Sequence, residues 1–300
     1  MSRNVRVALV QDTATGSAEE VLAKSIDKLR EAAANKAQIC CLKELFSSPY
    51  FCTKEEESHF DLAEDISSET FAKLAEVAKE NRLVIIVPFF ERRAAGVYHN
   101  SAAVIDADGS ILGVYRKMHI PDDPLYYEKY YFTPGDSDEV NSGYRIFDTA
   151  YGRIGVLICW DQWYPEAARI TSLLGAEILF YPTAIGWHPS EKEECGEQQW
   201  EAWHTVQRSH AIANGLYVAA VNRVGHEKTE GSDGIEFYGR SFVCAPNGEV
   251  IGQARTGEEE LLCVDCDLSL IETHRRQWPF FRDRRIDSYS SITKRFIDDE

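Results

Sequence analysis

Three residues able to act together in acyl transfer stand just after stretches of apolar residues in this chain. Glu44 lies in ICCLKELF, Lys117 in ILGVYRKMHIP and Cys159 in RIGVLICWDQW. If these stretches are strands, their ends bring a carboxylate, an ammonium and a thiol to one sheet edge. The carboxylate can then take the thiol proton and the thiolate can attack an amide-like carbon. The ammonium can bind the developing oxyanion together with the backbone N–H of Trp160.

The segment around Cys159 is a favourable place for a nucleophile. The apolar run ends at Ile158, and a helix is expected to follow, with Pro165 and Glu166 suited to its first turn. The free N–H groups and positive dipole end of that helix would favour thiolate over thiol. The alternative is that Cys159 is a small buried apolar side chain, as free cysteines commonly are.

Apolar runs of strand length alternate with helical patterns along the chain, which predicts a layered α/β protein. The predicted strands are 5–10, 39–42, 83–87, 102–105, 111–115, 153–158, 178–181, 217–221, 241–245, 250–253 and 261–264. The predicted helices are 18–35, 68–81, 165–174 and 198–214.

A weak internal repeat favours two copies of one α/β unit. Ala37-Gln38-Ile39 recurs as Ala176-Glu177-Ile178, and the hairpin turn Asp108-Gly109 recurs as Asn247-Gly248. Two such units sharing a core would make a four-layer αββα sandwich with an internal pseudo-twofold repeat, in one domain covering residues 1–300. The alternative is a chance resemblance between common α/β patterns.

Composition narrows the classes of partner. The formal net charge of −17 argues against binding to nucleic acid or to an anionic membrane, and it favours a neutral or cationic small molecule. The start of the chain lacks the pattern of a secretion signal, and no apolar stretch is long enough to span a bilayer. We therefore expect a cytoplasmic protein whose eight cysteines are reduced. Cys263 and Cys266 have CxxC spacing, but no second ligand pair accompanies them, so we expect no metal site there.

The three segments LKELF, GVYRKMHIP and VLICWDQWYPEAAR resemble the signature segments of the nitrilase superfamily of carbon-nitrogen hydrolases. This resemblance implies an αββα sandwich that works without metal or organic cofactor. It also implies that Glu44 is the general base, Lys117 the stabiliser of the tetrahedral intermediate and Cys159 the nucleophile. Glu128, in YYEKYYFTPGD, matches a second glutamate that positions substrate and lysine. The family further suggests a homo-oligomer, with residues 268–300 extending over a partner subunit.

Longer strings, among them YRKMHIPDDP, EKYYFTPGD and ILFYPTAIG, are similar to a branch of the superfamily that hydrolyses urea-like carbamoyl amines. By that resemblance the partner is a small carbamoyl amine, and an acidic pocket would attract its far ammonium. Asp122 could instead be an ordinary turn residue. The expected substrate-binding residues are Tyr50, Asp122, Trp160, Thr183 and His188.

One position departs from that branch. Where an acidic residue is expected two positions after PTAIG, this chain has Trp187-His188. The missing carboxylate would have paired with the amine of the substrate. Glu191, Glu193 or Glu194 could replace it from the same segment.

Three alternatives remain at this point. A related enzyme acting on a carboxylate-bearing amide would need a cation in the pocket, for which Arg208 or Arg223 could serve. An inert member of the fold would bind ligands without catalysis, which intact Glu44, Lys117 and Cys159 argue against. A cysteine enzyme could instead use histidine, and its candidates are His119, His204 and His210.

Overall fold

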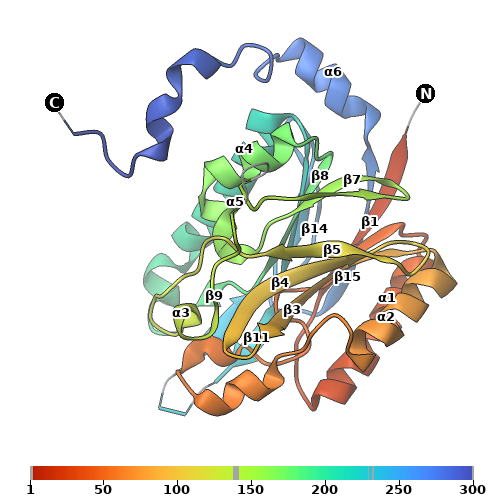
Figure 1. The fold of residues 1–300 in the computed structure, drawn as a ribbon, viewed down its shortest axis with the longest axis vertical. Coiled ribbons are helices and arrows are strands. Elements are labelled where there is room, and N and C mark those ends of the chain that lie inside the picture. Colours follow the sequence, from red (N-terminus) through yellow and green to blue (C-terminus); the bar gives the residue numbers. More distant parts are fainter. Residues whose placement is uncertain (1–2, 138–141, 229, 232, 299–300) are drawn as a thin grey trace.

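Two six-stranded sheets make up the body of the molecule in the computed structural model, which describes residues 3–137, 142–228, 230–231 and 233–298 (Figure 1). The first sheet has the strand order β15 (Glu260–Asp267), β1 (Asn4–Gln11), β2 (Ile39–Cys41), β3 (Val84–Ala94), β4 (Val97–Ile105), β5 (Ile111–Arg116). The second has the order β14 (Val250–Gln253), β13 (Phe242–Cys244), β10 (Tyr217–Asn222), β8 (Ile178–Thr183), β7 (Gly152–Val156), β6 (Ile146–Thr149). The predicted α/β class is confirmed.

The two sheets have the same pattern of strand directions. In the first, β1, β2 and β3 run parallel, while β4 and β5 continue as antiparallel neighbours and β15 pairs antiparallel with β1. In the second, β7, β8 and β10 run parallel, β13 and β14 continue antiparallel, and β6 pairs antiparallel with β7. Each parallel step is made through a helix, as such connections require.

The helices cover the outer faces of the sheets. Figure 1 shows α1 and α2 along one side of the molecule and α4 and α5 along the other, with the strands between them. The helices are α1 (Ala18–Ala34), α2 (Glu69–Asn81), α3 (Glu128–Tyr131), α4 (Pro165–Leu173), α5 (Lys192–Asn214) and α6 (Ser269–Gln277). None of the helices in the described part of the chain is both long and apolar enough to cross a membrane.

Side-chain alternation along β1 explains why both faces of its sheet are buried. Val7 and Leu9 belong to the core between the two sheets, where they join residues such as Phe180 of β8. Ala8 and Val10 belong to a second core beneath α1 and α2, which also contains Leu29 and Phe71. Because successive strand residues point to opposite faces, a fully apolar run such as this one is stable only when covered on both sides.

Several boundaries differ from the sequence prediction. Strands β3 and β4 extend into a long hairpin whose polar end has no apolar pattern, and α5 begins at Lys192, before the predicted 198. A third sheet of three short strands was not predicted: β11 (Val224–Glu227), β12 (Ile235–Tyr238) and β9 (Gly186–Trp187). Short strands of this kind are formed by tertiary pairing and carry too few residues for a periodic signal. Strand β6 and helices α3 and α6 were also missed.

The C-terminal segment carries large apolar side chains that are exposed in the single chain. Phe281 lies beneath the guanidinium groups of Arg169 and Arg275, at 5.1 and 4.3 Å from its ring centre. Farther along, Ile286 and Phe296 are 76% and 75% exposed. Figure 1 shows the segment after α6 passing beyond the α4 end of the molecule toward the C-terminus.

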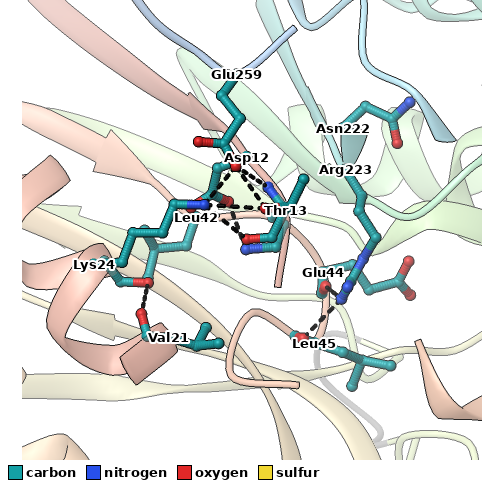
Figure 2. A network of polar contacts seen from close by, with 12 residues as sticks. Asp12, Thr13, Val21, Lys24, Leu42, Glu44, Leu45, Asn222, Arg223 and Glu259 are labelled. Carbon is teal, nitrogen blue, oxygen red and sulfur yellow. Dashed lines mark hydrogen bonds and ion pairs between the residues drawn. The ribbon is translucent and has the colours of Figure 1, made fainter. Parts of the chain in front are cut away.

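A buried ion pair lies next to the end of β2. Lys43 Nζ is 2.5 Å from Asp12 Oδ1, and both side chains are 1% exposed. Burial lowers the pKa of Lys43 to about 8, although the charge of Asp12 opposes this shift. Figure 2 shows the neighbouring polar contacts, in which Lys24 reaches Thr13 and Glu259.

Asp12→Asn is expected to lower the free energy of unfolding by about 3 to 5 kcal/mol, because it leaves the Lys43 ammonium buried without its counter-ion. The double variant Asp12→Leu with Lys43→Met replaces the pair by apolar groups and should recover most of that loss. Denaturant unfolding of the three proteins measures both effects. Equal stability of the single variant and the unaltered protein would contradict the prediction.

Candidate active site

Cys159 lies in a tight turn at the end of the second sheet. It is the first residue of the 3₁₀ turn Cys159–Trp163, which follows β7, and its φ of +41° is in the left-handed region. A residue other than glycine is strained there and stays only where its surroundings hold it. The α-helix itself starts later, at Pro165, which occupies its first turn as predicted.

The expectation that a helix terminus holds Cys159 as a thiolate is wrong. The side chain is 5% exposed, and burial raises the pKa of its thiol well above the usual value. The negative charge of Glu44 raises that pKa further, and the opposing effect of Lys117 is smaller. The resting side chain is therefore a thiol, which needs a base at the moment of attack.

Asp161 ties the turn of Cys159 to the segment that carries Lys117. One of its carboxylate oxygens accepts from Ile158 N at 2.9 Å and from the Tyr115 hydroxyl at 2.7 Å. The other accepts from His119 N at 3.0 Å and lies 2.7 Å from His119 Nδ1. Since Tyr115 and His119 flank Lys117, the fully buried carboxylate of Asp161 fixes the position of the end of β5 relative to the end of β7.

Helix α5 holds the same turn from the outside. The side-chain oxygen of Gln162 accepts from Trp203 Nε1 at 2.7 Å and from Gln207 Nε2 at 2.9 Å. His210 Nε2 lies 2.8 Å from the backbone oxygen of Gln162. The long helix thus contributes to the rigidity of the turn that presents Cys159.

Glu44, Lys117 and Glu128 form one buried cluster, as the strand ends predict for the first two. Lys117 Nζ lies 2.8 Å from Glu44 Oε1 and 2.6 Å from Glu128 Oε2. Asn100 of β4 donates to Glu44 Oε1 at 2.7 Å, and the Tyr50 hydroxyl donates to Glu128 Oε1 at 2.7 Å. Glu44 Oε2 is buried and has no partner within the described chain, so it is free to accept a proton.

The charged groups in this cluster shift one another's pKa values. Burial by itself would lower the pKa of Lys117, but Glu128 and Glu44 raise it well above its usual value, so the ammonium stays charged. Burial raises the pKa of Glu128, and Glu44 adds to that rise while Lys117 opposes it. A lysine between two carboxylates is thereby a permanent positive charge close to Cys159.

The charges around Cys159 predict opposite effects of two substitutions on its pKa. Glu44→Gln removes a charge that raises the thiol pKa, so that pKa should fall, whereas Lys117→Met removes a charge that lowers it, so that pKa should rise. The rate of alkylation by iodoacetamide follows the thiolate fraction. We expect its pH curve to move to lower pH in the first variant and to higher pH in the second. Shifts in the same direction would contradict this electrostatic account.

A cavity of about 510 Å³ opens onto the thiol. Its wall includes Cys159 and, from the buried cluster, Glu128. Asp123, Glu191 and His188 also line it. Among the described residues the wall has no lysine or arginine. The field in this cavity therefore favours a ligand whose far end is cationic.

The structure places some of the expected substrate-binding residues on this wall and others behind it. Trp160 and His188 line the cavity. Tyr50 is buried behind Glu128, and Thr183 is fully buried with its hydroxyl donating to Tyr181 O at 3.0 Å. Asp122 is exposed and does not line the cavity.

Carboxylates reach the wall from two neighbouring segments. Asp123 lines the cavity in place of the expected Asp122, although both aspartates are exposed. Of the three glutamates that could compensate for the Trp187-His188 departure, only Glu191 lines the cavity. Trp187 itself is buried and donates from Nε1 to Gly196 O at 2.8 Å, so His188 alone of that pair faces the ligand space.

Sequence reasoning missed Tyr238 and Trp163, two residues that line the cavity. The Tyr238 hydroxyl and Trp163 Nε1 are buried, and neither has a hydrogen-bond partner in the described chain. Trp163 could have been predicted, because it belongs to the recognised CWDQW segment. Tyr238 could not, because it lies on the unpredicted strand β12. Asn100 had no signal, since it lies between His99 and Ser101 in the polar part of β4, before the predicted strand 102–105.

The histidine candidates have structural contacts instead of places beside the thiol. The His119 ring stacks on Tyr164 at 3.7 Å and pairs with Asp161, while His204 stacks on Trp200 at 4.9 Å. His210 packs under the nucleophile turn, and burial lowers its pKa. These contacts give no support to a cysteine–histidine enzyme.

Neither arginine candidate is available to a substrate carboxylate. Arg208 donates from Nε to Gly248 O at 2.9 Å, on the far side of α5, and it does not line the cavity. Arg223 is completely buried and bonded to backbone carbonyls and Glu227. Within the described residues, no group of three or more His, Cys, Asp or Glu side chains could hold a metal ion.

Comparison with known proteins shows the family. The carbon-nitrogen hydrolase family matches residues 6–276, and the chain belongs to it. It is 44% identical to the N-carbamoylputrescine amidase of Arabidopsis thaliana over 97% of this chain and 95% of that one. It is 43% identical to the citrullinase of Francisella tularensis over 98% and 99% of the two chains. The structure of a carbon-nitrogen hydrolase from Helicobacter pylori G27 superposes with a TM-score of 0.93 at 45% identity, covering 98% and 100%.

Proposed function

We propose that this protein hydrolyses N-carbamoylputrescine to putrescine, carbon dioxide and ammonia through a covalent intermediate on Cys159. The observation that carries the choice of substrate is the cavity beside Cys159, whose described wall has three carboxylates and a histidine but no lysine or arginine. Overall identity does not discriminate, because the putrescine-type and citrulline-type relatives are 44% and 43% identical. Both substrates carry the same ureido group, and they differ in the charge at the far end.

The proposed first half-reaction starts with proton transfer from the Cys159 thiol to Glu44 Oε2, the unpartnered oxygen of that carboxylate. The sulfur then attacks the carbamoyl carbon. Lys117 and the N–H of Trp160 stabilise the oxygen as it becomes negative. When the tetrahedral intermediate collapses, the C–N bond breaks and Glu44 returns its proton to the departing nitrogen.

The second half-reaction regenerates the enzyme. Water gives a proton to Glu44 and attacks the thioester carbon, and the C–S bond breaks as the proton returns to sulfur. The released carbamic acid decomposes to carbon dioxide and the remaining amine. Glu128 supports both steps by holding Lys117 charged and in place, through the 2.6 Å contact.

The far end of the substrate would lie among Asp123, Glu191 and His188. Both carboxylates are exposed, and either can supply a counter-charge to the ammonium of the substrate. The far end of citrulline carries a carboxylate beside its ammonium, and that carboxylate would face like charges and find no lysine or arginine on the described wall.

A competition assay tests the choice of substrate. N-carbamoylputrescine should be preferred over its neutral analogue butylurea by roughly 10- to 100-fold in kcat/KM, in line with one charged hydrogen-bond pair of about 1.5 to 3 kcal/mol. Citrulline and N-carbamoyl-β-alanine should be poorer still. Glu191→Gln should reduce the preference, and Glu193→Gln, whose side chain does not line the cavity, serves as the matched control. A preference for either carboxylate-bearing substrate would overturn the polyamine assignment without touching the catalytic set.

The architecture and assembly expected from the sequence are part of the same proposal. The matching strand directions of the two sheets support a four-layer αββα sandwich built from a pseudo-twofold repeat. We also propose that residues 1–300 form one domain and that the apolar side chains of residues 268–300 cover a partner subunit in a homo-oligomer. Light scattering on the full chain and on a variant ending at Gln277 would test the assembly. The cytoplasmic location stays a prediction.

A further inference from the structure

Arg223 joins the second half of the chain to the loop that carries Glu44. It stands between β10 and β11, and its side chain is 0% exposed. Nη2 donates to Glu44 O at 3.1 Å and to Leu45 O at 2.9 Å, contacts that Figure 2 shows. Nη1 donates to Ser48 O at 3.0 Å. One guanidinium therefore binds three carbonyls of a single turn, each from a different residue.

Glu227 completes this arrangement and extends it to Tyr50. Its Oε1 accepts from Arg223 Nη1 at 2.7 Å, and its Oε2 accepts from Tyr50 N at 2.5 Å. The hydroxyl of Tyr50 in turn donates to Glu128. The pair Arg223–Glu227 thus holds the backbone on both sides of the turn, close to two of the groups that contact Lys117.

The turn that Arg223 binds has a strained backbone conformation. Leu45, directly after Glu44, has a φ of +49°. A leucine in the left-handed region is strained and persists only when neighbouring groups fix it. The planar fork of an arginine can bind several carbonyls at set angles, which the single ammonium of a lysine cannot reproduce.

We propose that Arg223 and Glu227 are positioning residues that set the place of the general base Glu44 and of Tyr50. The proposal rests on the role of Glu44 given above. Neither residue lines the cavity, so they act through the turn. A displacement of a catalytic group by about 1 Å can lower turnover by roughly 100-fold, so small relaxation of this turn suffices for a large effect.

Arg223→Lys and Glu227→Gln test the proposal. Both are expected to lower kcat about 10- to 100-fold on the best amide substrate found, while KM changes much less. Arg208→Lys is the matched control, because it also removes an arginine–carbonyl bond in the second half of the chain but far from Glu44. If Arg223→Lys fails to fold, Glu227→Gln carries the test, since it leaves the buried arginine in place. Unchanged kcat in a folded Glu227→Gln protein would overturn the proposal.

A double variant separates positioning from general destabilisation. In a Glu44→Gln protein the base is already absent, so adding Glu227→Gln should cause little further loss of the residual turnover. If Glu227 only stabilised the structure, Glu227→Gln would lower turnover by the same factor with and without Glu44→Gln. That result would overturn the proposal. If Glu44→Gln kept full turnover, Glu44 would not be the general base. If Glu44→Gln lost turnover but the Arg223 and Glu227 variants kept it, only the positioning role proposed here would be wrong.

Discussion

Cys159→Ala is expected to abolish turnover, because it removes the one thiol among the described residues of the cavity wall. Cys159→Ser should be nearly as inactive, since a hydroxyl is a far weaker nucleophile than a thiol at neutral pH. Folding should be retained in both, as the substitutions are small. Ammonia release under saturating substrate measures turnover, and circular dichroism reports the fold.

The matched control is Cys244→Ala, which alters another buried cysteine, on β13 in the second sheet. It should lose some stability but keep its turnover. Retention of even a tenth of normal turnover by Cys159→Ala would exclude Cys159 as the nucleophile. Mass spectrometry of protein quenched during turnover should find the added carbamoyl group on Cys159 and on no other cysteine.

Glu44→Gln is expected to lower kcat by about 100-fold or more, which is the usual contribution of a general base. The amide is similar in size to the carboxylate and can still accept hydrogen bonds from Lys117 and Asn100, so substrate binding should be retained. It cannot take up the thiol proton at Oε2. Steady-state kinetics should therefore show a fall in kcat with little change in KM.

Glu44→Asp is the informative companion variant. It keeps a carboxylate but withdraws it by one methylene, so an intermediate kcat is expected. If Glu44→Gln turned over normally, another group would have to accept the proton. The buried cluster of Glu44, Lys117 and Glu128 would then be structural. Its effect on the charge state of Cys159 would be tested only by the opposite pH shifts expected for alkylation of the Glu44→Gln and Lys117→Met variants.

The main elements could be predicted from local patterns. Long apolar runs and helical periodicity give β1, α1 and α2 to within a few residues, because a strand or helix buried on a set face must carry apolar side chains at that spacing. The meeting of Glu44 with Lys117 was also predictable, since both follow strands that end at the same region of the sheets. The paired short strands β9, β11 and β12 were not, because their pairing is decided by distant segments.

The sequence by itself determined the kinds of groups at the site: a thiol, a carboxylate and an ammonium at strand ends, in a strongly acidic chain, with a second carboxylate implied by the family resemblance. Only the tertiary structure decided which of two adjacent aspartates lines the cavity and that the thiol is protonated at rest. It also decided that Arg223 binds the turn of Glu44 instead of a substrate. The physical reason is that residue type and periodicity are local properties, whereas burial, charge proximity and side-chain direction depend on segments far apart in the chain.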